Sequence, residues 1–232
     1  VVQHVRGDPL PGRQRRVTRI VPGENPQVNG YWICDLGRYG YHDIDDNRLT
    51  AKAVKNIPLS KEKAADWEDV IRGLAGDLKS LAASGRASRM TVVLNSFLTN
   101  EELGLCRKIF GGSLGLQNIF FADPKPGEAD GFLLTADRAP NGRGAASLGF
   151  TPKLPDLDAP VGSTELMVVF GAHILEHVSA EKVTDWLKRS GKTYLFEAHT
   201  SGLAAAAAVV MPTALPAEKN GSYTNIAGLT QS

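Results

Sequence analysis

The feature that most constrains the fold is an alternation, between residues 67 and 196, of short apolar runs and longer stretches with helical periodicity. The apolar runs occupy residues 90–95, 118–121, 131–134, 165–170 and 193–196. Short, continuously apolar runs are typical of strands buried on both faces of a sheet. Strands that alternate with helices of about 10–15 residues indicate βαβ units. The sequence therefore predicts an α/β fold, with a Rossmann-like, mostly parallel sheet and flanking helices.

Three amphipathic helices are predicted between these runs. The first has apolar residues at helical spacing over residues 67–81 and ends at Ser84-Gly85. The second opens with a capping box, Thr99-Asn-Glu-Glu102, and carries Cys106 on its apolar side. The third begins at the cap residue Ser179. We expect Cys106 to be a core residue, since free cysteines are among the most buried side chains.

The first fifty residues have a different pattern. Residues 1–22 alternate in polarity around Gly and Pro breakers, which predicts a hairpin, and a loop then leads into a segment around Cys34. We predict a small β-rich domain over residues 1–50, a linker over 51–60, and an α/β domain filling residues 51–232. The arginines near the N-terminus fit either a solvated strand face or a docking edge.

Composition excludes several classes of function. A net charge of +1 gives no electrostatic footprint for nucleic acid or for an anionic membrane surface. The longest apolar run, residues 202–211, is shorter than the roughly 20 residues that a membrane helix needs, so we expect no direct membrane insertion. Two distant cysteines argue against a disulfide framework and suit a reducing, cytoplasmic setting.

Cys34 is the strongest candidate for a metal ligand. It follows the apolar run Tyr31-Trp-Ile33 and precedes Asp35, Gly37 and Arg38. Ligation requires the thiolate, which nearby backbone N–H groups and a guanidinium would favour. The alternative is an ordinary buried free cysteine.

The wider segment, Asn25-Pro-x-Val-Asn-Gly-Tyr-Trp-Ile-Cys-Asp-x-Gly-Arg38, resembles the last-cysteine segment of the iron–sulfur domain in molybdopterin-oxidoreductase-like proteins. Its Cys-Asp-x-Gly-Arg form is similar to that of the large iron–sulfur subunit of NADH:quinone oxidoreductase, respiratory complex I. In that family this cysteine completes a [4Fe–4S] site begun by an upstream Cys-x-x-Cys-x-x-x-Cys run, which this chain does not contain. Either the chain is a segment taken from inside that domain or the cluster is absent, and the sequence leaves both open.

The resemblance continues through the rest of the chain, with departures. Further similar segments are Asn100-Glu-Glu-Leu103, Asp130-Gly-Phe-Leu-Leu134 (the family's central strand), Ala139-Pro-Asn-x-x-Gly-Ala145, 211–212, 217–225 and 228–231. Alanine stands at position 208, where the family has aspartate, and Leu229 stands where arginine is usual. The region between Phe150 and Val161 is much shorter than in full-length relatives, so we expect a shortened domain that binds no molybdopterin.

The resemblance implies an iron–sulfur and scaffold subunit that takes part in electron transfer from NADH to quinone. Cys34 would be the metal ligand of one [4Fe–4S] cluster, with Trp32, Asp35 and Arg38 shaping its surroundings and no catalytic residue in this chain. The partners would be other subunits of a respiratory NADH dehydrogenase complex. The chain would be cytoplasmic and peripheral to the inner membrane through those subunits. The alternatives are a molybdopterin-dependent, formate-dehydrogenase-like oxidoreductase and a cluster-free structural interaction module.

Three weaker patterns remain. His173-Ile-Leu-Glu-His177 matches a zinc-protease pattern, but it lies between a strand and the cap at Ser179, so we expect about one helical turn there. A surface turn or an incidental metal site fits this context better than catalysis. Asp43, Asp45 and Asp46 read as a solvated turn, with a divalent-ion site as the alternative. No Gly-x-Gly-x-x-Gly follows any predicted strand, so a dinucleotide site of that kind is unsupported.

Overall fold

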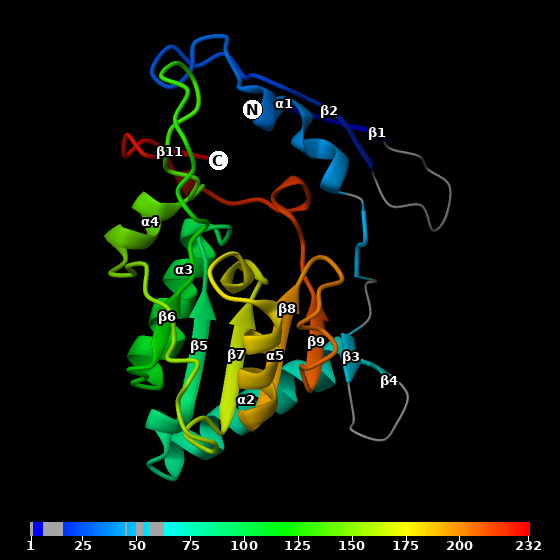
Figure 1. Cartoon of the computed structure of the whole chain (residues 1–232), viewed down its shortest axis with the longest axis vertical. Helices are drawn as coiled ribbons and strands as arrows, with labels where there is room; N and C mark the ends of the chain where they lie inside the picture. Colours follow the sequence, from blue (N-terminus) through cyan, green and yellow to red (C-terminus); the bar gives the residue numbers. More distant parts are fainter. Residues whose placement is uncertain (1, 7–15, 45, 50–52, 56–62) are drawn as a thin grey trace.

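A computed structural model describes residues 2–6, 16–44, 46–49, 53–55 and 63–232 (Figure 1). Its centre is a sheet of seven strands in the order β4-β3-β9-β8-β7-β5-β6. The strands are β3 (Ala53–Lys55), β4 (Lys63–Ala65), β5 (Met90–Leu94), β6 (Ile119–Phe121), β7 (Leu166–Phe170), β8 (Lys192–Glu197) and β9 (Val209–Pro212). The strands from β9 through β6 pair in parallel, whereas β3 and β4 are antiparallel additions next to β9. The predicted α/β fold with a mostly parallel sheet is confirmed.

Helices cover both faces of this sheet. The helical elements are α2 (Trp67–Ala83), α3 (Asn100–Cys106), the π-helical η3 (Arg107–Ser113), α4 (Gly142–Ser147), η4 (His173–Glu176) and α5 (Ala180–Arg189). One face, with Val92, Val168 and Tyr194, packs in a single core with residues of α2 and α3. The opposite face packs in a second core with Val183, Trp186 and Leu187 of α5. The result is a helix–sheet–helix sandwich.

Local sequence signals set the helix ends. Asp66 caps α2 by accepting from the Glu68 N–H at 2.8 Å, and Gly85 follows its C-terminus with a φ of 73° that favours glycine. The predicted capping box is present, with Thr99 and Glu102 each accepting from the other's backbone N–H. Cys106 is buried in the core, as predicted.

Strand order defines a switch point in the chain's path. From β5 the chain passes to β6 on one side, then to β7, β8 and β9 on the other. In open sheets of this kind, ligands bind beyond the carboxyl ends of the strands, where the order reverses. That point lies between β5 and β7.

Two sequence expectations are wrong. Residues 131–134 form a bend rather than a buried strand, because the Asp130 carboxylate accepts from the backbone N–H groups of Phe132, Leu133 and Leu134, each at 2.8 Å. Phe132 is 72% exposed. Within the expected linker, β3 is a strand, because its backbone pairs with β9.

The N-terminal region lies at the end of the molecule toward which β5 and β7 point (Figure 1). It contains an antiparallel hairpin of β1 (Val2–Arg6) and β2 (Arg16–Val21), which confirms the predicted pairing. The hairpin is followed by helical structure that the sequence did not indicate, the short helix α1 (Asp35–Tyr39) and a 3-10 turn, η1 (Gly40–Ile44).

The C-terminal region ends with η5 (Pro216–Glu218) and a small pair of strands, β10 (Tyr223–Thr224) and β11 (Thr230–Gln231). Asn100 of α3 ties this region to the sheet domain, since its side-chain amide donates to Thr224 at 3.0 Å. Within the described ranges, no helix has the length and apolar character required to cross a bilayer.

Candidate functional site

A cavity of about 820 Å³ opens at the carboxyl ends of β5, β7, β8 and β9. Its volume falls in the range of small-molecule sites, roughly 300–1,000 Å³. Most of its walls are apolar or aromatic: Trp67, Phe97, Leu98, Leu105, Ile109, Phe110, Phe170, Phe196 and Leu215. It therefore lies at the edge of the sheet where the topology predicts ligand binding.

Asn95 joins the two loops at the switch point. Its side-chain amide donates to the carbonyl of Phe170, and its Oδ1 accepts from the backbone N–H of Phe97 at 2.9 Å. The residue is 3% exposed, so both bonds are shielded from water. One buried side chain thus holds the end of β5 against the end of β7.

His173 forms part of the same wall. Its ring stacks on Phe97, with ring centroids 4.2 Å apart and an interplanar angle of 4°. Its Nδ1 lies 3.2 Å from Oε1 of Glu176, and Glu176 Oε2 accepts from the backbone N–H of Lys125 at 3.1 Å. These contacts fix the imidazole at the mouth of the switch point.

Glu197, the last residue of β8, is the most unusual polar group of the cavity wall. It is 8% exposed, and its Oε1 accepts from the backbone N–H of Ala198 at 2.9 Å. Its Oε2 is buried without a hydrogen-bond partner in the described part of the chain. Burial raises the pKa of this carboxyl group, although nearby His173 and His199 oppose the shift. A buried, perturbed carboxyl in a cavity wall is a recognised mark of a functional site.

Two further lining residues also have buried polar atoms without a partner among the described residues: Nε2 of His199 and Oγ of Ser201. Opposite them, Lys219 donates to Oε2 of Glu102 at 2.6 Å and to the Phe97 carbonyl at 3.3 Å. The C-terminal segment is thereby tied to α3. The cavity thus combines an ion pair on one wall with unmatched polar atoms on another.

A second cavity, of about 460 Å³, lies beside β6 and α4. Asp123 lines it, has a buried Oδ1 without a partner in the described residues, and has a pKa raised by burial. His177 lines the same cavity, and its Nε2 contacts the Asp123 carbonyl. The two histidines of the sequence pattern thus have different partners, on the single helical turn that the sequence predicts.

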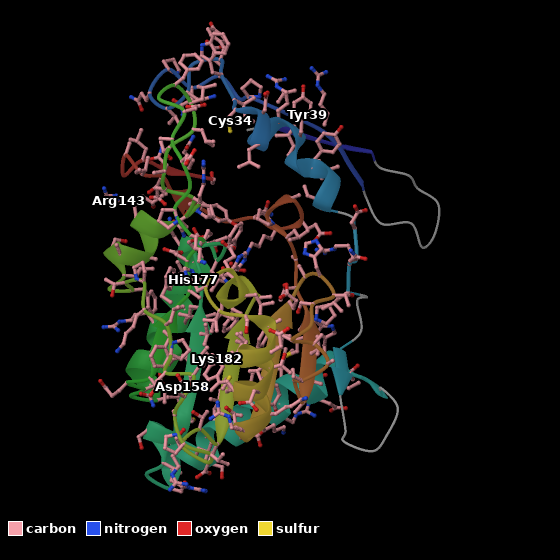
Figure 2. All side chains as sticks on the ribbon, in the orientation of Figure 1. Cys34, Tyr39, Arg143, Asp158, His177 and Lys182 are labelled. Carbon is pink, nitrogen blue, oxygen red and sulfur yellow. The ribbon has the colours of Figure 1, made fainter. Side chains whose placement is uncertain are left out.

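Cys34 lies outside both cavities, at the N-terminal end of the molecule (Figure 2). It caps α1, and its Sγ accepts from the backbone N–H of Gly37 at 3.4 Å. The side chain is half-buried. A sulfur that accepts an N–H bond while keeping one side open can act as a ligand toward a second segment.

The three residues expected to surround Cys34 have separate positions. Trp32 is 61% exposed and meets Phe132 edge-on, with ring centroids 5.8 Å apart. Asp35 is exposed in the first turn of α1, and Arg38 donates its backbone N–H to the Cys34 carbonyl at 2.9 Å. The structure thus places all four residues on one short segment.

A [4Fe–4S] cluster needs four thiolates, and this chain has two cysteines. Burial raises the pKa of the Cys106 thiol to about 12, so that residue is unsuited to ligation. Among the described residues, no group of three or more His, Cys, Asp or Glu side chains is placed to hold a metal ion. The residues present therefore fit one corner of a cluster whose other ligands come from outside this chain. The acidic turn falls partly outside the described residues, which exclude Asp45 and the side chain of Asp43.

The sequence did not indicate the cavity. Its key residues follow strands as single letters, Asn95 after β5 and Glu197 at the end of β8, without a motif around them. The one usable signal is an acidic residue directly after the apolar run 193–196, at the edge where parallel strands present their ends.

Comparison with known proteins gives partial matches. The chain is 39% identical to NADH-quinone oxidoreductase subunit 3 of Thermus thermophilus over 67 residues, covering 29% of this chain and 8% of that protein. It is 30% identical to another NADH-quinone oxidoreductase subunit, from Streptomyces coelicolor, over 132 residues, covering 56% and 15%. It is 26% identical to the probable oxidoreductase YjgC of Bacillus subtilis over 106 residues, covering 45% and 11%. The matches thus span less than a sixth of each of these relatives' length.

No protein-family model matches the chain. The matched relatives nevertheless include subunits of the complex to which the motif around Cys34 pointed, the large iron–sulfur subunit among them. The chain is therefore similar to part of the large iron–sulfur subunit of NADH-quinone oxidoreductase, which confirms the resemblance found in the sequence.

Proposed function

We propose that this chain acts as an iron–sulfur and scaffold subunit in an NADH–quinone oxidoreductase complex. In this role Cys34 supplies one thiolate to a [4Fe–4S] cluster, and a cluster of that kind transfers single electrons. The observation that carries the proposal is the setting of Cys34, whose sulfur accepts a backbone N–H bond while remaining half-buried. Residues 1–50 would be the cluster-type domain, and 51–232 the shortened α/β domain that supports it.

An exposed apolar patch around Cys34 supports the scaffold role. Six side chains form it, each 40–72% exposed: Val28, Tyr31, Trp32, Leu36, Tyr39 and Phe132. Clusters of exposed aromatic and aliphatic side chains mark interaction surfaces. We propose that this patch faces sister subunits, and that the chain is cytoplasmic and reaches the inner membrane only through them.

The test uses the natural gene product with its upstream codons, purified without oxygen. Iron content, acid-labile sulfide and the thiolate-to-iron absorption band are measured for the wild type, C34S and the matched control C106S. We expect cluster content in the wild type and C106S, and loss of most of it in C34S. A wild-type protein without iron, or a C34S variant with full cluster content, would contradict the role of Cys34.

The cluster-free alternative gives a different result in the same preparation. An interaction module would lack iron but still co-purify with other subunits. Replacing Tyr31 and Trp32 by serine should then abolish co-purification, while Ser substitution at Cys34 should not. Retention of the partners by the Tyr31/Trp32 variant would contradict the proposed surface.

A further inference from the structure

The large cavity at the carboxyl edge of the sheet has no part in the role proposed for Cys34. It is a concave space of about 820 Å³ with aromatic walls and a few polar groups. This combination is the usual form of a small-molecule site. The charges of the walls indicate which class of molecule it suits.

The walls carry an excess of negative charge. Three lining carboxylates, Glu102, Glu176 and Glu197, face one lining ammonium, Lys219, which leaves a net charge of −2 when the histidines are neutral. Glu102 is neutralised by its 2.6 Å ion pair with Lys219. Glu176 is held by His173 and by the Lys125 N–H. Only Glu197 keeps a carboxylate oxygen without a donor among the described residues.

The aromatic walls favour a cation over a neutral apolar molecule. Phe170 and Phe196 stack on one another with centroids 4.7 Å apart, and Phe97 and Trp67 also line the space. The faces of aromatic rings attract ammonium groups, most strongly where water is excluded. Anions such as phosphates meet the opposite condition, because they would be repelled by the uncompensated carboxylates.

We propose that this cavity binds an organic ammonium compound with an apolar, ring-sized body, and that the ammonium group pairs with Glu197. The Glu197 side chain is 8% exposed, so it turns its Oε2 toward the cavity to meet the ligand. The ligand then supplies the donor that this oxygen lacks in the free protein. The ring of the ligand lies against the phenylalanines. This site does not depend on whether Cys34 binds a cluster.

Three indole probes of nearly equal size test the charge rule by isothermal titration calorimetry. Tryptamine is cationic, tryptophol is neutral and indole-3-acetate is anionic. We expect tryptamine to bind at least about tenfold more tightly than tryptophol, the effect of one charge-assisted hydrogen bond, and indole-3-acetate to bind most weakly. Equal affinities for tryptamine and indole-3-acetate, or no binding of any probe, would overturn the proposal.

Two variants locate the site. E197Q keeps the shape of the side chain and should weaken tryptamine binding about tenfold while changing tryptophol binding by less than about twofold. E128Q, at an exposed position outside the cavity, is the matched control and should bind all three probes as the wild type does. In the wild-type amide NMR spectrum, tryptamine should shift the signals of Gly171 and Ala198. Unchanged tryptamine affinity in E197Q, or shifts confined to other regions, would refute the site.

Discussion

The segment around Cys34 and the carboxyl edge of the sheet differ in how they are built. Cys34 is held by contacts within a few residues, such as the Gly37 N–H bond, and its neighbours are largely exposed. The sheet edge is built from residues far apart in sequence, as in the contact of Asn95 with the Phe170 carbonyl. A local site can be read from a motif, whereas a site assembled by topology has no continuous sequence to read. Substitutions in the two regions should therefore differ in effect, from several kcal/mol at the sheet edge to almost nothing at Cys34.

The largest effect should come from the core beneath the sheet edge. Leu103 is fully buried, so Leu103→Ala should lower the free energy of unfolding by about 2–5 kcal/mol. The matched change near Cys34, Leu36→Ala, removes a side chain that is 65% exposed and should change stability by less than about 0.5 kcal/mol. Guanidinium unfolding of both variants measures the difference. Similar losses would show that the N-terminal segment is packed as firmly as the sheet.

The link at the switch point should have the next effect. Asn95→Ala removes both hydrogen bonds and leaves buried backbone groups without partners, at a cost of about 1–3 kcal/mol. It should also speed amide exchange at Phe97, whose N–H loses its acceptor. Hydrogen exchange measured by NMR checks this, with Asn118→Ala, at an exposed position, as the control. Unaltered exchange at Phe97 would contradict the bridging role.

Two carboxyl groups should give pH effects of opposite sign. The pKa of Glu197 is raised by burial, so its penalty is absent below the ordinary value of 4.5 and grows as pH rises from there through the raised pKa. E197Q should therefore be more stable than the wild type at neutral pH, with the gain vanishing toward pH 4.

Glu101 provides the opposite case. Hydrogen bonds from Ser222 lower its pKa to about 2, so its contribution is present above 4.5 and is lost as pH falls toward 2. E101Q should therefore lose stability at neutral pH but not near pH 2. Unfolding curves over this pH range measure both variants. The same sign of change in both would contradict the assigned environments.

The smallest change in stability should accompany the clearest chemical difference. Cys34 is half-buried, whereas Cys106 is buried with a pKa of about 12, so iodoacetamide should modify Cys34 alone in the native protein. C34S should change the free energy of unfolding by less than about 0.5 kcal/mol. Mass spectrometry of the alkylated native protein identifies the site. Modification of Cys106 at a comparable rate would show that its helix opens readily.

Sequence reasoning recovered the elements that are set by local chemistry. The strand at 90–94, the helix end at Ser84-Gly85 and the capping box at Thr99 follow from apolar runs, a glycine and a hydroxyl. It failed where a tertiary contact decides the structure. The strand β3 exists only by pairing with its neighbours in the sheet, and residues 131–134 look like a strand but are bent around the Asp130 carboxylate. The cavity was missed for the same reason, because Glu197 gains its meaning from its neighbours in space.

The edges of the parallel sheet have a consequence for assembly. On one side, β3 occupies the hydrogen-bonding edge of β9, pairing Val54 with Val210. On the other, the backbone of Lys153 exchanges two hydrogen bonds of 2.9 Å with Phe121 of β6. Exposed strand edges invite other chains to extend a sheet, and both of these strands are already covered. Neighbouring proteins would thus recognise this part of the molecule by the shape and chemistry of its side chains, and the covers guard it against fibril-like growth.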